Sequence, residues 1–421
     1  MAPDTIPESS PPGPGRQQSR AFMLSTLDLS DFDAAGRKVL MRVDFNVPLD
    51  GDRNITDDTR IKAALPSISR ILAAGGSVIL MSHLGRPKGQ VVPAMSLRPV
   101  ADRLVELVDA PVKFAADTVG PEATELAGSL QPGEVLLLEN LRFAKGETDN
   151  DDEFAAGLAA LGDSYVNDAF GTAHRAHAST VGVTRHFDEC RAGLLMEKEL
   201  DNLGALLSKP DRPFVAVLGG AKVGSKVDVI VNLLDRVDTL LLGGGMIFTF
   251  FKGHGLNIGN SLLDEESLEI AREISEKAKA SSTRFVLPED CVVATEFSDT
   301  AESKICLVTD IPDGWMGLDI GPRTVAKFQE ILAGARATFW NGPMGVFELP
   351  SFAAGTRAVG EAVAAATDAG GRSVVGGGDS VAAINQLGLA DRISHISTGG
   401  GASLEFMAGR DLPGIDALTD R

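Results

Sequence analysis

The sequence predicts an α/β protein of two doubly wound, Rossmann-like domains, each built on a parallel sheet and joined by a hinge helix. Short runs rich in Val, Ile and Leu alternate with amphipathic stretches through most of the chain. These runs are almost continuously apolar, which is typical of parallel strands covered by helices on both faces. The chain has 421 residues, enough for two or three domains of ordinary size.

Ten apolar runs are predicted as strands, and most of them end in Gly, Asn, Asp or His. Four lie in the first half of the chain and six in the second: 39–46, 77–85, 134–142 and 164–171, then 214–220, 239–245, 284–290, 338–342, 372–378 and 395–401. The amphipathic segments between them predict helices at 58–74, 267–280, 324–333 and 352–368. In the first helix, four apolar residues keep helical spacing before a Gly-Gly stop: Ile61, Leu65, Ile68 and Leu72.

A longer helix is predicted at 194–207, with two prolines just beyond its end. We interpret it as the connection between an N-terminal domain (23–192) and a C-terminal domain (208–403), with the interdomain helix assigned to 193–207. Residues 1–22 are rich in Pro, Ser and Gly and lack apolar periodicity, so a disordered N-terminal extension is expected there.

The composition excludes several classes of protein. A formal net charge of −19 argues against nucleic acid or an anionic membrane as the main partner. The longest charge-free apolar run, 239–251, contains three glycines and is too short to span a bilayer. The three cysteines include no CxxC pair, which argues against a disulfide framework or a zinc ribbon and fits a reducing cytoplasm.

Basic and polar residues gather where the strands of the first half end. Ligands of open parallel sheets bind at the carboxyl ends of strands, so these positions predict a site. They are Arg42, Asp44, Asn46, His83, Arg86, Arg142, Asn167, Asp168, His174, Arg175 and His177, with Arg60 at the start of the following helix. Any one of these arginines alone could be a surface ion-pair partner. Together, on an acidic protein, they predict a receptor for a small polyanion.

Glycine ends the strands of the second half. Gly-rich turns occur at 219–220, 243–245, 376–378 and 399–401. One such turn can serve packing alone, but four that lead into helices predict exposed backbone N–H groups and a nucleotide. Lys222 and Lys226 are expected to lie one helical turn apart, facing the same way, either as a surface pair or as phosphate contacts. Asp379 is expected at a helix start, as an N-cap and as a ligand for Mg²⁺.

Two well-known nucleotide-binding motifs are not matched by this sequence, which restricts the class of enzyme. GGAKVGSK (219–226) ends in Ser-Lys and is therefore not a Walker A motif. No GxGxxG follows a strand with an acidic residue at the right distance, which argues against an NAD-dependent dehydrogenase. A polyanion receptor opposite a nucleotide receptor is the anatomy of a small-molecule kinase.

Several long strings resemble the phosphoglycerate kinase family, in order and from about Leu27 to the C-terminus. They are RVDFNVP (42–48), SHLGRPKG (82–89), LENLRF (138–143), VNDAFGTAHRAHAST (166–180), GGAKVGSK (219–226), LLLGGGM (240–246), FWNGPMGVFE (339–348), GGGDS (376–380) and STGGGAS (397–403). The resemblance implies reversible, Mg²⁺-dependent phosphoryl transfer between ATP and the carboxylate of 3-phosphoglycerate, giving 1,3-bisphosphoglycerate and ADP. It also implies that a C-terminal segment, from about 404 to 421, returns to the first domain, and a cytoplasmic monomer is expected.

The resemblance further implies a role for each matching residue. The 3-phosphoglycerate site would comprise Arg42, Asp44, Asn46, Arg60, His83, Leu84, Gly85, Arg86, Arg142 and Arg175. The nucleotide site would comprise Lys222, Lys226, Gly243, Gly244, Phe297, Leu318, Asn341, Pro343, Glu348, Gly377, Gly378, Asp379 and Ser380. Glu348 would accept from the ribose hydroxyls and Asp379 would hold Mg²⁺. The transferring group would be stabilised by Arg42, Lys222, Gly399 and Gly400.

The chemistry agrees with these assignments. A carboxylate nucleophile is already ionised at neutral pH, so catalysis needs positioning and charge cancellation rather than a general base. His83, His174 and His177 are therefore interpreted as anion donors or helix-end partners. A catalytically silent scaffold remains the alternative, although it would require losses at the site. Transfer also predicts a closing motion about the 194–207 helix and the 397–403 crossing.

Overall fold

The computed structural model describes residues 29–419, which form two compact units. One unit contains 29–201 and 411–419, and the other contains 202–410, so the boundary falls inside helix α7 (Leu194–Ser208). The extension predicted at 1–22 lies outside the described residues. The segment that returns to the first unit begins at Asp411 rather than near 404. Residues 404–410 stay with the second unit, where Asn232 Nδ2 donates to the carbonyl of Met407 at 2.7 Å.

The first unit is built on a six-stranded sheet with the order β3-β4-β2-β1-β5-β6, in which every neighbouring pair is parallel. Its strands are β1 (Lys38–Arg42), β2 (Ser77–Met81), β3 (Val112–Phe114), β4 (Val135–Leu137), β5 (Ser164–Asn167) and β6 (Cys190–Ala192). The central strand β2 is buried at every position, as a strand covered on both faces must be.

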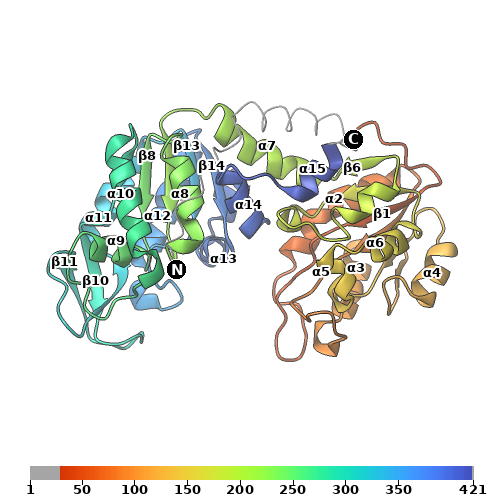
Figure 1. Cartoon of the computed structure of the whole chain (residues 1–421), viewed down its shortest axis with the longest axis horizontal. Helices are drawn as coiled ribbons and strands as arrows, with labels where there is room; N and C mark the ends of the chain where they lie inside the picture. The colour runs from red at the N-terminus through yellow and green to blue at the C-terminus, as the bar shows by residue number, and fades with distance from the viewer. Residues whose placement is uncertain (1–28, 420–421) are drawn as a thin grey trace, which may run out of the picture. The chain divides into compact units, whose positions relative to one another are not determined.

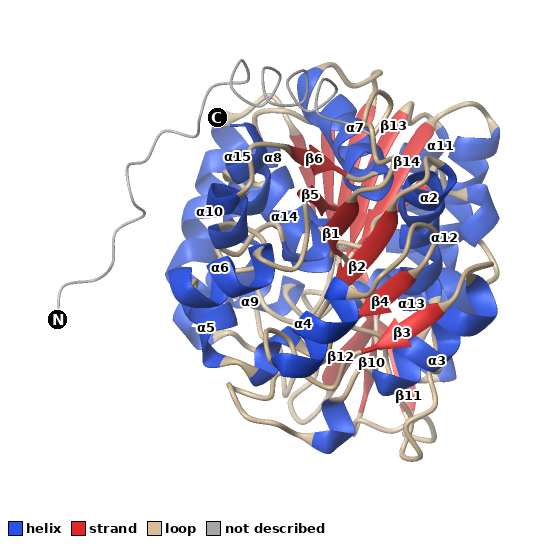
Figure 2. Ribbon diagram, turned by 90° about the vertical axis from the view of Figure 1, so that its right-hand side faces the viewer, coloured by secondary structure: helices blue, strands red, loops and turns tan. Residues whose placement is uncertain are grey.

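Helices cover this sheet (Figure 2). They are α2 (Thr59–Ala73), α3 (Arg98–Leu107), α4 (Pro121–Gly128), α5 (Lys145–Asp149), α6 (Asp152–Ala159) and α15 (Pro413–Thr419). The predicted helical face of α2 is confirmed at Ile61 and Ile68, which join Val78 and Leu80 of β2 in one core. The chain's last helix, α15, contacts β6 (Figure 1).

The second unit repeats this design with the sheet order β15-β14-β13-β7-β8-β9, again entirely parallel. Its strands are β7 (Phe214–Leu218), β8 (Thr239–Leu242), β9 (Arg284–Val286), β13 (Ala337–Asn341), β14 (Arg372–Gly376) and β15 (His395–Ile396). Its helices are α8 (Val227–Leu233), α9 (Ile247–Gly253), α10 (Leu268–Ala280), α11 (Pro322–Ala333), α12 (Ala354–Asp368), α13 (Gly378–Gln386) and α14 (Gly400–Met407). Helix α8 lies beside α10 and α14 (Figure 1).

The prediction of two parallel α/β sheets is confirmed, but the second unit also holds a small antiparallel sheet that the sequence did not predict. Its order is β11-β10-β12, from β10 (Asp290–Ala294), β11 (Ser303–Leu307) and β12 (Met316–Ile320). Strand β11 is largely exposed and carries the sequence SKICL, so it lacks the buried apolar run on which the predictions relied. Within residues 29–419, every helix is too short or too polar to cross a lipid bilayer.

Candidate functional site

The first candidate site lies at the carboxyl ends of β1, β2 and β4, where a network joins five of the predicted residues. Arg60 Nη1 donates to Asp44 Oδ2 at 2.8 Å. The backbone N–H of Gly85 donates to Asn46 Oδ1 at 2.8 Å, and Arg142 Nη1 donates to the carbonyl of Gly85 at the same distance. Gly85 has a φ of +63°, a conformation that favours glycine. Residues from three strand ends are thus held together as the sequence predicted.

Leu84, Arg86 and Arg175 complete this site in different ways. Leu84 is buried, and its carbonyl accepts from Asn140 Nδ2 at 2.7 Å. Arg86 and Arg175 are exposed, and Arg175 Nε lies 3.0 Å from His174 Nε2. The side chain of Arg60 is about one-third exposed. These three guanidinium groups are therefore the ones in the cluster that a ligand arriving from solvent can contact.

Arg42 is the most deeply buried member of the predicted arginine cluster. Its side chain is fully buried, with Nε donating to Ser179 Oγ at 2.8 Å and Nη2 lying 3.2 Å from His83 Nδ1. The third guanidinium nitrogen, Nη1, donates to the carbonyl of Val43, and Nη2 lies 4.0 Å from Glu147 Oε1. The contact predicted between Arg42 and the transferring phosphoryl group therefore stays a prediction, because here the guanidinium contacts protein groups. In this structure Arg42 contacts His83 and the backbone at the end of β1.

The electrostatics of the cluster favour an anionic ligand. Burial, followed by the charges of Arg42 and Arg175, lowers the pKa of Arg142 to about 10. Burial and three neighbouring arginines also hold the pKa of His83 well below its ordinary value. For His174, burial and then Arg175 lower the pKa to about 4. Like charges are thus crowded together, and an anion bound among them would relieve the repulsion.

Two predicted site residues serve the fold instead. Asn167 Nδ2 donates to the carbonyl of Gly414, tying α15 to β5 at 3.2 Å. Asp168 is buried, and its Oδ1 accepts from the backbone N–H groups of Leu195 and Met196 at 2.8 and 3.0 Å. Asp168 therefore caps the start of α7 rather than facing a ligand.

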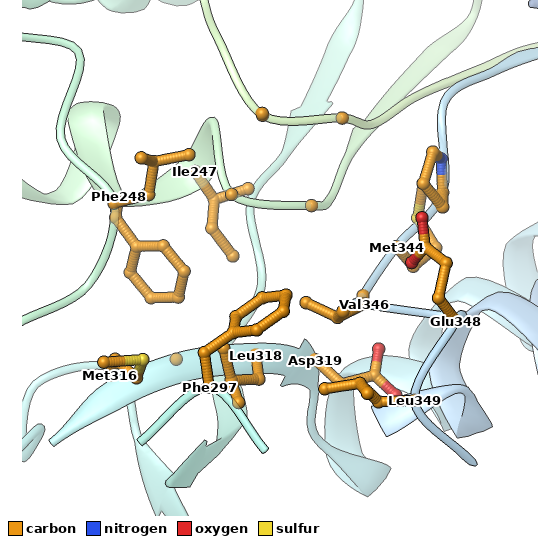
Figure 3. Close-up of a pocket in the computed structure, with 18 of the residues that line it drawn as sticks. Ile247, Phe248, Phe297, Met316, Leu318, Asp319, Met344, Val346, Glu348 and Leu349 are labelled. Carbon is orange, nitrogen blue, oxygen red and sulfur yellow. The ribbon is translucent and has the colours of Figure 1, made fainter. Parts of the chain in front are cut away.

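The second candidate site is a cavity of about 620 Å³ in the second unit (Figure 3). Six of the predicted nucleotide residues line it: Gly244, Phe297, Leu318, Pro343, Glu348 and Asp379. Figure 3 shows Phe248 and Met316 at one end and Glu348 at the other. The cavity therefore has an apolar end suited to a base and a carboxylate where a sugar would lie.

A polar network lies next to this cavity at the ends of β13 and β14. Lys226 Nζ donates to Asn341 Oδ1, and Asn341 Nδ2 donates to the carbonyl of Gly376 at 2.8 Å. Burial lowers the pKa of Lys226 to about 8, opposed by the charge of Asp379. Ser380 Oγ accepts from the backbone N–H of Gly342. The network places a buried ammonium group near the first turn of α13.

The start of α13 corrects one prediction. Its N-cap is Gly377, with a φ of +93°, and the helix runs from Gly378. Asp379 therefore lies in the first turn rather than at the N-cap, and its carboxylate is exposed. The first-turn N–H groups and the helix dipole form the kind of terminus that binds phosphate.

The predicted pairing of Lys222 and Lys226 is wrong. Helix α8 begins at Val227, after the short 3₁₀ turn Gly224–Lys226, so Lys222 lies in the preceding loop. Lys222 is exposed whereas Lys226 is buried. The two ammonium groups are thus in different environments, and only Lys222 is free to move in solvent.

Most of the glycines at the ends of β7 and β8 serve packing. The N–H groups of Gly219, Gly220, Gly243 and Gly244 donate to backbone carbonyls at 2.8–3.1 Å. A Cβ at Gly219 would lie 2.1 Å from the carbonyl oxygen of Pro343. The loops that follow β7 and β13 can therefore lie this close only because position 219 is a glycine. The four amides are not available to phosphate, and Gly243 does not line the cavity.

The last glycine turn is divided between two roles. The N–H of Gly399 donates to Ser397 Oγ at 3.2 Å, which removes it from the predicted set of donors. Gly400 has a φ of +24° and begins α14. The N–H groups of Gly400 and Gly401 lie in the first helical turn, where amides lack an intrahelical acceptor, whereas the N–H of Ala402 donates to the carbonyl of Gly399 at 2.6 Å.

The sequence did not single out most of the apolar lining of the cavity. These residues are Ile247, Phe248, Leu262, Met316, Met344, Val346 and Leu349. An apolar residue near a strand end has the same pattern whether it joins a core or a ligand pocket, so no sequence signal distinguishes them. Within residues 29–419, no group of three or more His, Cys, Asp or Glu side chains could hold a metal ion. Asp379 would therefore bind a cation only together with other ligands.

Comparison with known proteins matches most of the chain, across both units, to one family. A profile of the family "Phosphoglycerate kinase" matches residues 29–410. The phosphoglycerate kinase of Chlorobium limicola is 57% identical over 392 residues, covering 93% of this chain and 99% of the relative. The enzyme of Chlorobaculum tepidum is also 57% identical, with the same coverage. Among solved structures, phosphoglycerate kinase from Coxiella burnetii has a TM-score of 0.83 at 40% identity, covering 94% of this chain and 99% of the other. That from Pyrococcus horikoshii has a TM-score of 0.82 at 36% identity, covering 93% and 98%.

Proposed function

The chain belongs to the phosphoglycerate kinase family, and we propose that it catalyses reversible phosphoryl transfer between ATP and the carboxylate of 3-phosphoglycerate. The products are 1,3-bisphosphoglycerate and ADP, and the enzyme is a phosphotransferase of glycolysis. The observation that carries the proposal is the cavity lined by Phe297, Glu348 and Asp379. The buried Lys226 lies beside it. Its apolar end suits adenine, Glu348 suits the ribose hydroxyls, and the start of α13 suits the phosphates.

The cluster of arginines in the first unit would bind 3-phosphoglycerate. This ligand carries a phosphate and a carboxylate, and the guanidinium fork of Arg matches both groups. We assign the direct contacts to Arg60, Arg86 and Arg175, which solvent reaches, and assign Arg42 to support. The lowered pKa of Arg142 supports the same assignment, because an anion would offset the crowding of positive charge.

Mg²⁺ fits the residues present. It commonly binds through one or two protein carboxylates together with substrate phosphates and water. Asp379 offers one exposed carboxylate in the first turn of α13, beside the place proposed for the phosphates. When bound, the ion would neutralise charge on the nucleotide phosphates.

Phosphoryl transfer then requires positioning rather than acid–base chemistry. A carboxylate oxygen of 3-phosphoglycerate attacks the γ-phosphorus, and the bond from that phosphorus to the ADP oxygen breaks. Lys222, on its exposed loop, would follow the transferring group. The N–H groups of Gly400 and Gly401, at the start of α14, would donate to it.

The test is ADP formation from ATP and Mg²⁺ with and without 3-phosphoglycerate. We expect ADP to form only when 3-phosphoglycerate is present, in amounts equal to 1,3-bisphosphoglycerate trapped as its hydroxamate. The matched variants are Lys226→Met, which should lose activity, and Lys209→Met at the surface, which should keep it. Failure of the wild-type protein to form ADP would contradict the proposal and favour the silent scaffold.

We further propose that both ligands together drive a closing motion about α7 and the 397–403 crossing. Each ligand alone shifts a conformational equilibrium only by its differential affinity for the two states. Small-angle scattering should therefore show a smaller radius of gyration only when 3-phosphoglycerate and the Mg²⁺ nucleotide are both present. Equal radii in all four combinations would contradict the motion.

The remaining proposals concern the setting of the enzyme. We propose a cytoplasmic monomer that binds neither nucleic acid nor membrane. The net charge of −19 supports the absence of polyanionic partners, and three cysteines that are not disulfide-bonded suit a reducing compartment. Sedimentation of the purified protein tests the monomer directly.

A further inference from the structure

Two of the three cysteines face each other in the small antiparallel sheet. Cys291 of β10 and Cys306 of β11 are directly opposite in the register, and their Sγ atoms are 3.9 Å apart. Backbone bonds join Val308 to Glu289 and Thr295 to Glu302, so every second pair between these strands is hydrogen-bonded, the cysteine pair included. Such pairs have Cα atoms about 5.5 Å apart. That separation lies within the roughly 4.4–6.8 Å that a disulfide spans.

The two thiols differ in their access to solvent. Cys291 is fully buried on the central strand β10, whereas Cys306 is partly exposed on β11, one of the two edge strands. A reagent in solution can therefore reach Cys306 first, with Cys291 behind it as the second thiol.

We propose that Cys291 and Cys306 form a dithiol site that closes to a disulfide by exchange with a low-molecular-weight disulfide, and that closure weakens nucleotide binding. The second part rests on the function proposed above, because it takes the adjoining cavity to be the nucleotide site.

The exchange consists of two balanced displacements. The Cys306 thiol loses its proton to solvent, and the thiolate attacks one sulfur of the small disulfide, breaking its S–S bond and releasing one small thiolate that takes up a proton. Cys291 then loses its proton, and its thiolate attacks Cys306 Sγ and expels the second small thiol. Two protein thiols are oxidised by two electrons, and one small disulfide is reduced to two thiols.

Burial raises the pKa of Cys291, and burial raises the pKa of Cys306 as well, although the contact with Cys291 and then the charge of Lys304 oppose that second shift. The exchange is therefore slow in neutral solution and needs a sustained supply of oxidant. This distinguishes the pair from a rapidly reacting catalytic thiol.

Two segments connect the cysteine pair to the proposed nucleotide cavity: the loop between β10 and β11, and the neighbouring strand β12. The loop between β10 and β11 carries Phe297, which lines the cavity and is 65% exposed. On its other edge, β10 pairs with β12, which contributes Leu318 and Asp319 to the same cavity. Closing the sulfurs from 3.9 Å to about 2.05 Å cross-links β11 to β10 and fixes both cysteine side chains, so we expect the loop that joins the two strands, with Phe297, to lose freedom to adapt to a nucleotide.

The experiment uses the full chain, with oxidised glutathione as the probe at mildly alkaline pH. After incubation, free thiols are alkylated and counted by intact mass, and peptide mapping identifies the linkage. We expect two of the three thiols to disappear into a Cys291–Cys306 disulfide. The dissociation constant for ADP, measured by calorimetry, should rise about threefold or more and recover with dithiothreitol.

Three variants sharpen the result. Cys306→Ser and Cys291→Ala should each abolish the disulfide and the change in ADP affinity. Cys190→Ser, at β6 of the other sheet, should keep both. Absence of the Cys291–Cys306 linkage, or its formation with unchanged ADP affinity, would overturn the inference. A reduced wild-type protein that binds ADP but forms no ADP from ATP and 3-phosphoglycerate would contradict the proposed function and leave the dithiol inference intact.

Discussion

The guanidinium of Arg42 and the carboxylate of Glu147 are both fully buried and lie 4.0 Å apart. Ser179 bridges them, accepting from Arg42 Nε and donating its hydroxyl to Glu147 Oε1 at 2.7 Å. Burial would raise the pKa of Glu147, but the nearby His177 ring, the charge of Arg42 and a hydrogen bond from Ser179 hold it below its ordinary value. The pair is thus a charged core beneath the cluster of arginines that we assign to 3-phosphoglycerate.

Removing one member of this pair should destabilise the protein. Arg42→Met leaves the Glu147 charge buried without its partner, which costs on the order of 3–5 kcal/mol. Urea denaturation of the single variants and of Arg42→Met/Glu147→Gln would measure the effect. We expect the double variant to be more stable than Arg42→Met alone. If Arg42→Met instead unfolds at the wild-type urea concentration while kcat collapses, Arg42 acts directly on the transferring group, as the sequence first predicted.

The exposed Arg175 should act on substrate binding. Arg175→Ala removes a charge-assisted contact, so the KM for 3-phosphoglycerate should rise roughly 10- to 100-fold. The KM for ATP should stay within about twofold, because no nucleotide contact is lost. The matched control is Arg185→Ala, an exposed arginine that lies 3.7 Å from Asp152. Steady-state kinetics with each substrate varied in turn would check this, and an equal rise for Arg185→Ala would argue against a specific site.

Glu348 should recognise the ribose. If it accepts hydrogen bonds from the ribose hydroxyls, Glu348→Gln should lower kcat/KM for ATP about tenfold and leave 2′-deoxy-ATP much less affected. The control is Glu361→Gln, at an exposed position of α12. Comparable losses with both nucleotides would show that Glu348 acts elsewhere.

The sequence predicted the parallel sheets because buried parallel strands are nearly continuous apolar runs, and such runs are visible without a structure. It also predicted which strand ends carry polar groups. It could not predict which way each side chain points. Arg42 and Arg60 are both arginines near a strand or helix end, yet Arg42 is fully buried and Arg60 is a third exposed. Tertiary packing determines that difference, and the local sequence around each arginine carries no information about it.

The same reason explains the glycines and the small sheet. Gly243 and Gly378 stand in similar triplets, but the amide of Gly243 is bonded to Leu218, whereas Gly378 begins α13. Strand β11 has an exposed, mixed sequence and forms only because β10 lies beside it. Interactions between segments far apart in sequence decide such features.

Buried Asp168 should make stability depend on pH. Burial raises the pKa of Asp168 from 3.8 to about 7, with the Ser67 hydroxyl and the backbone amides of Met196 and Leu195 partly offsetting the effect. The folded protein therefore keeps a proton that the unfolded chain has released. Stability from this group is complete at low pH and is lost as the pH rises from about 4 to about 7.

The difference in unfolding free energy between wild type and Asp168→Asn isolates this contribution. Asn preserves an oxygen for the α7 amides but has no proton to release. As the pH rises through this window, the wild type should lose stability relative to the variant, and the difference should level off above about 7. Lowered pKa values, as for His83 and His174, change stability with pH in the opposite direction, but their contributions cancel in the difference because both proteins contain these groups.

Asp319→Asn should behave similarly, since burial raises the pKa of Asp319 to about 7 as well. Urea titrations at several pH values would measure both differences, and a flat difference for Asp168→Asn would mean that the carboxylate is ionised in the folded protein.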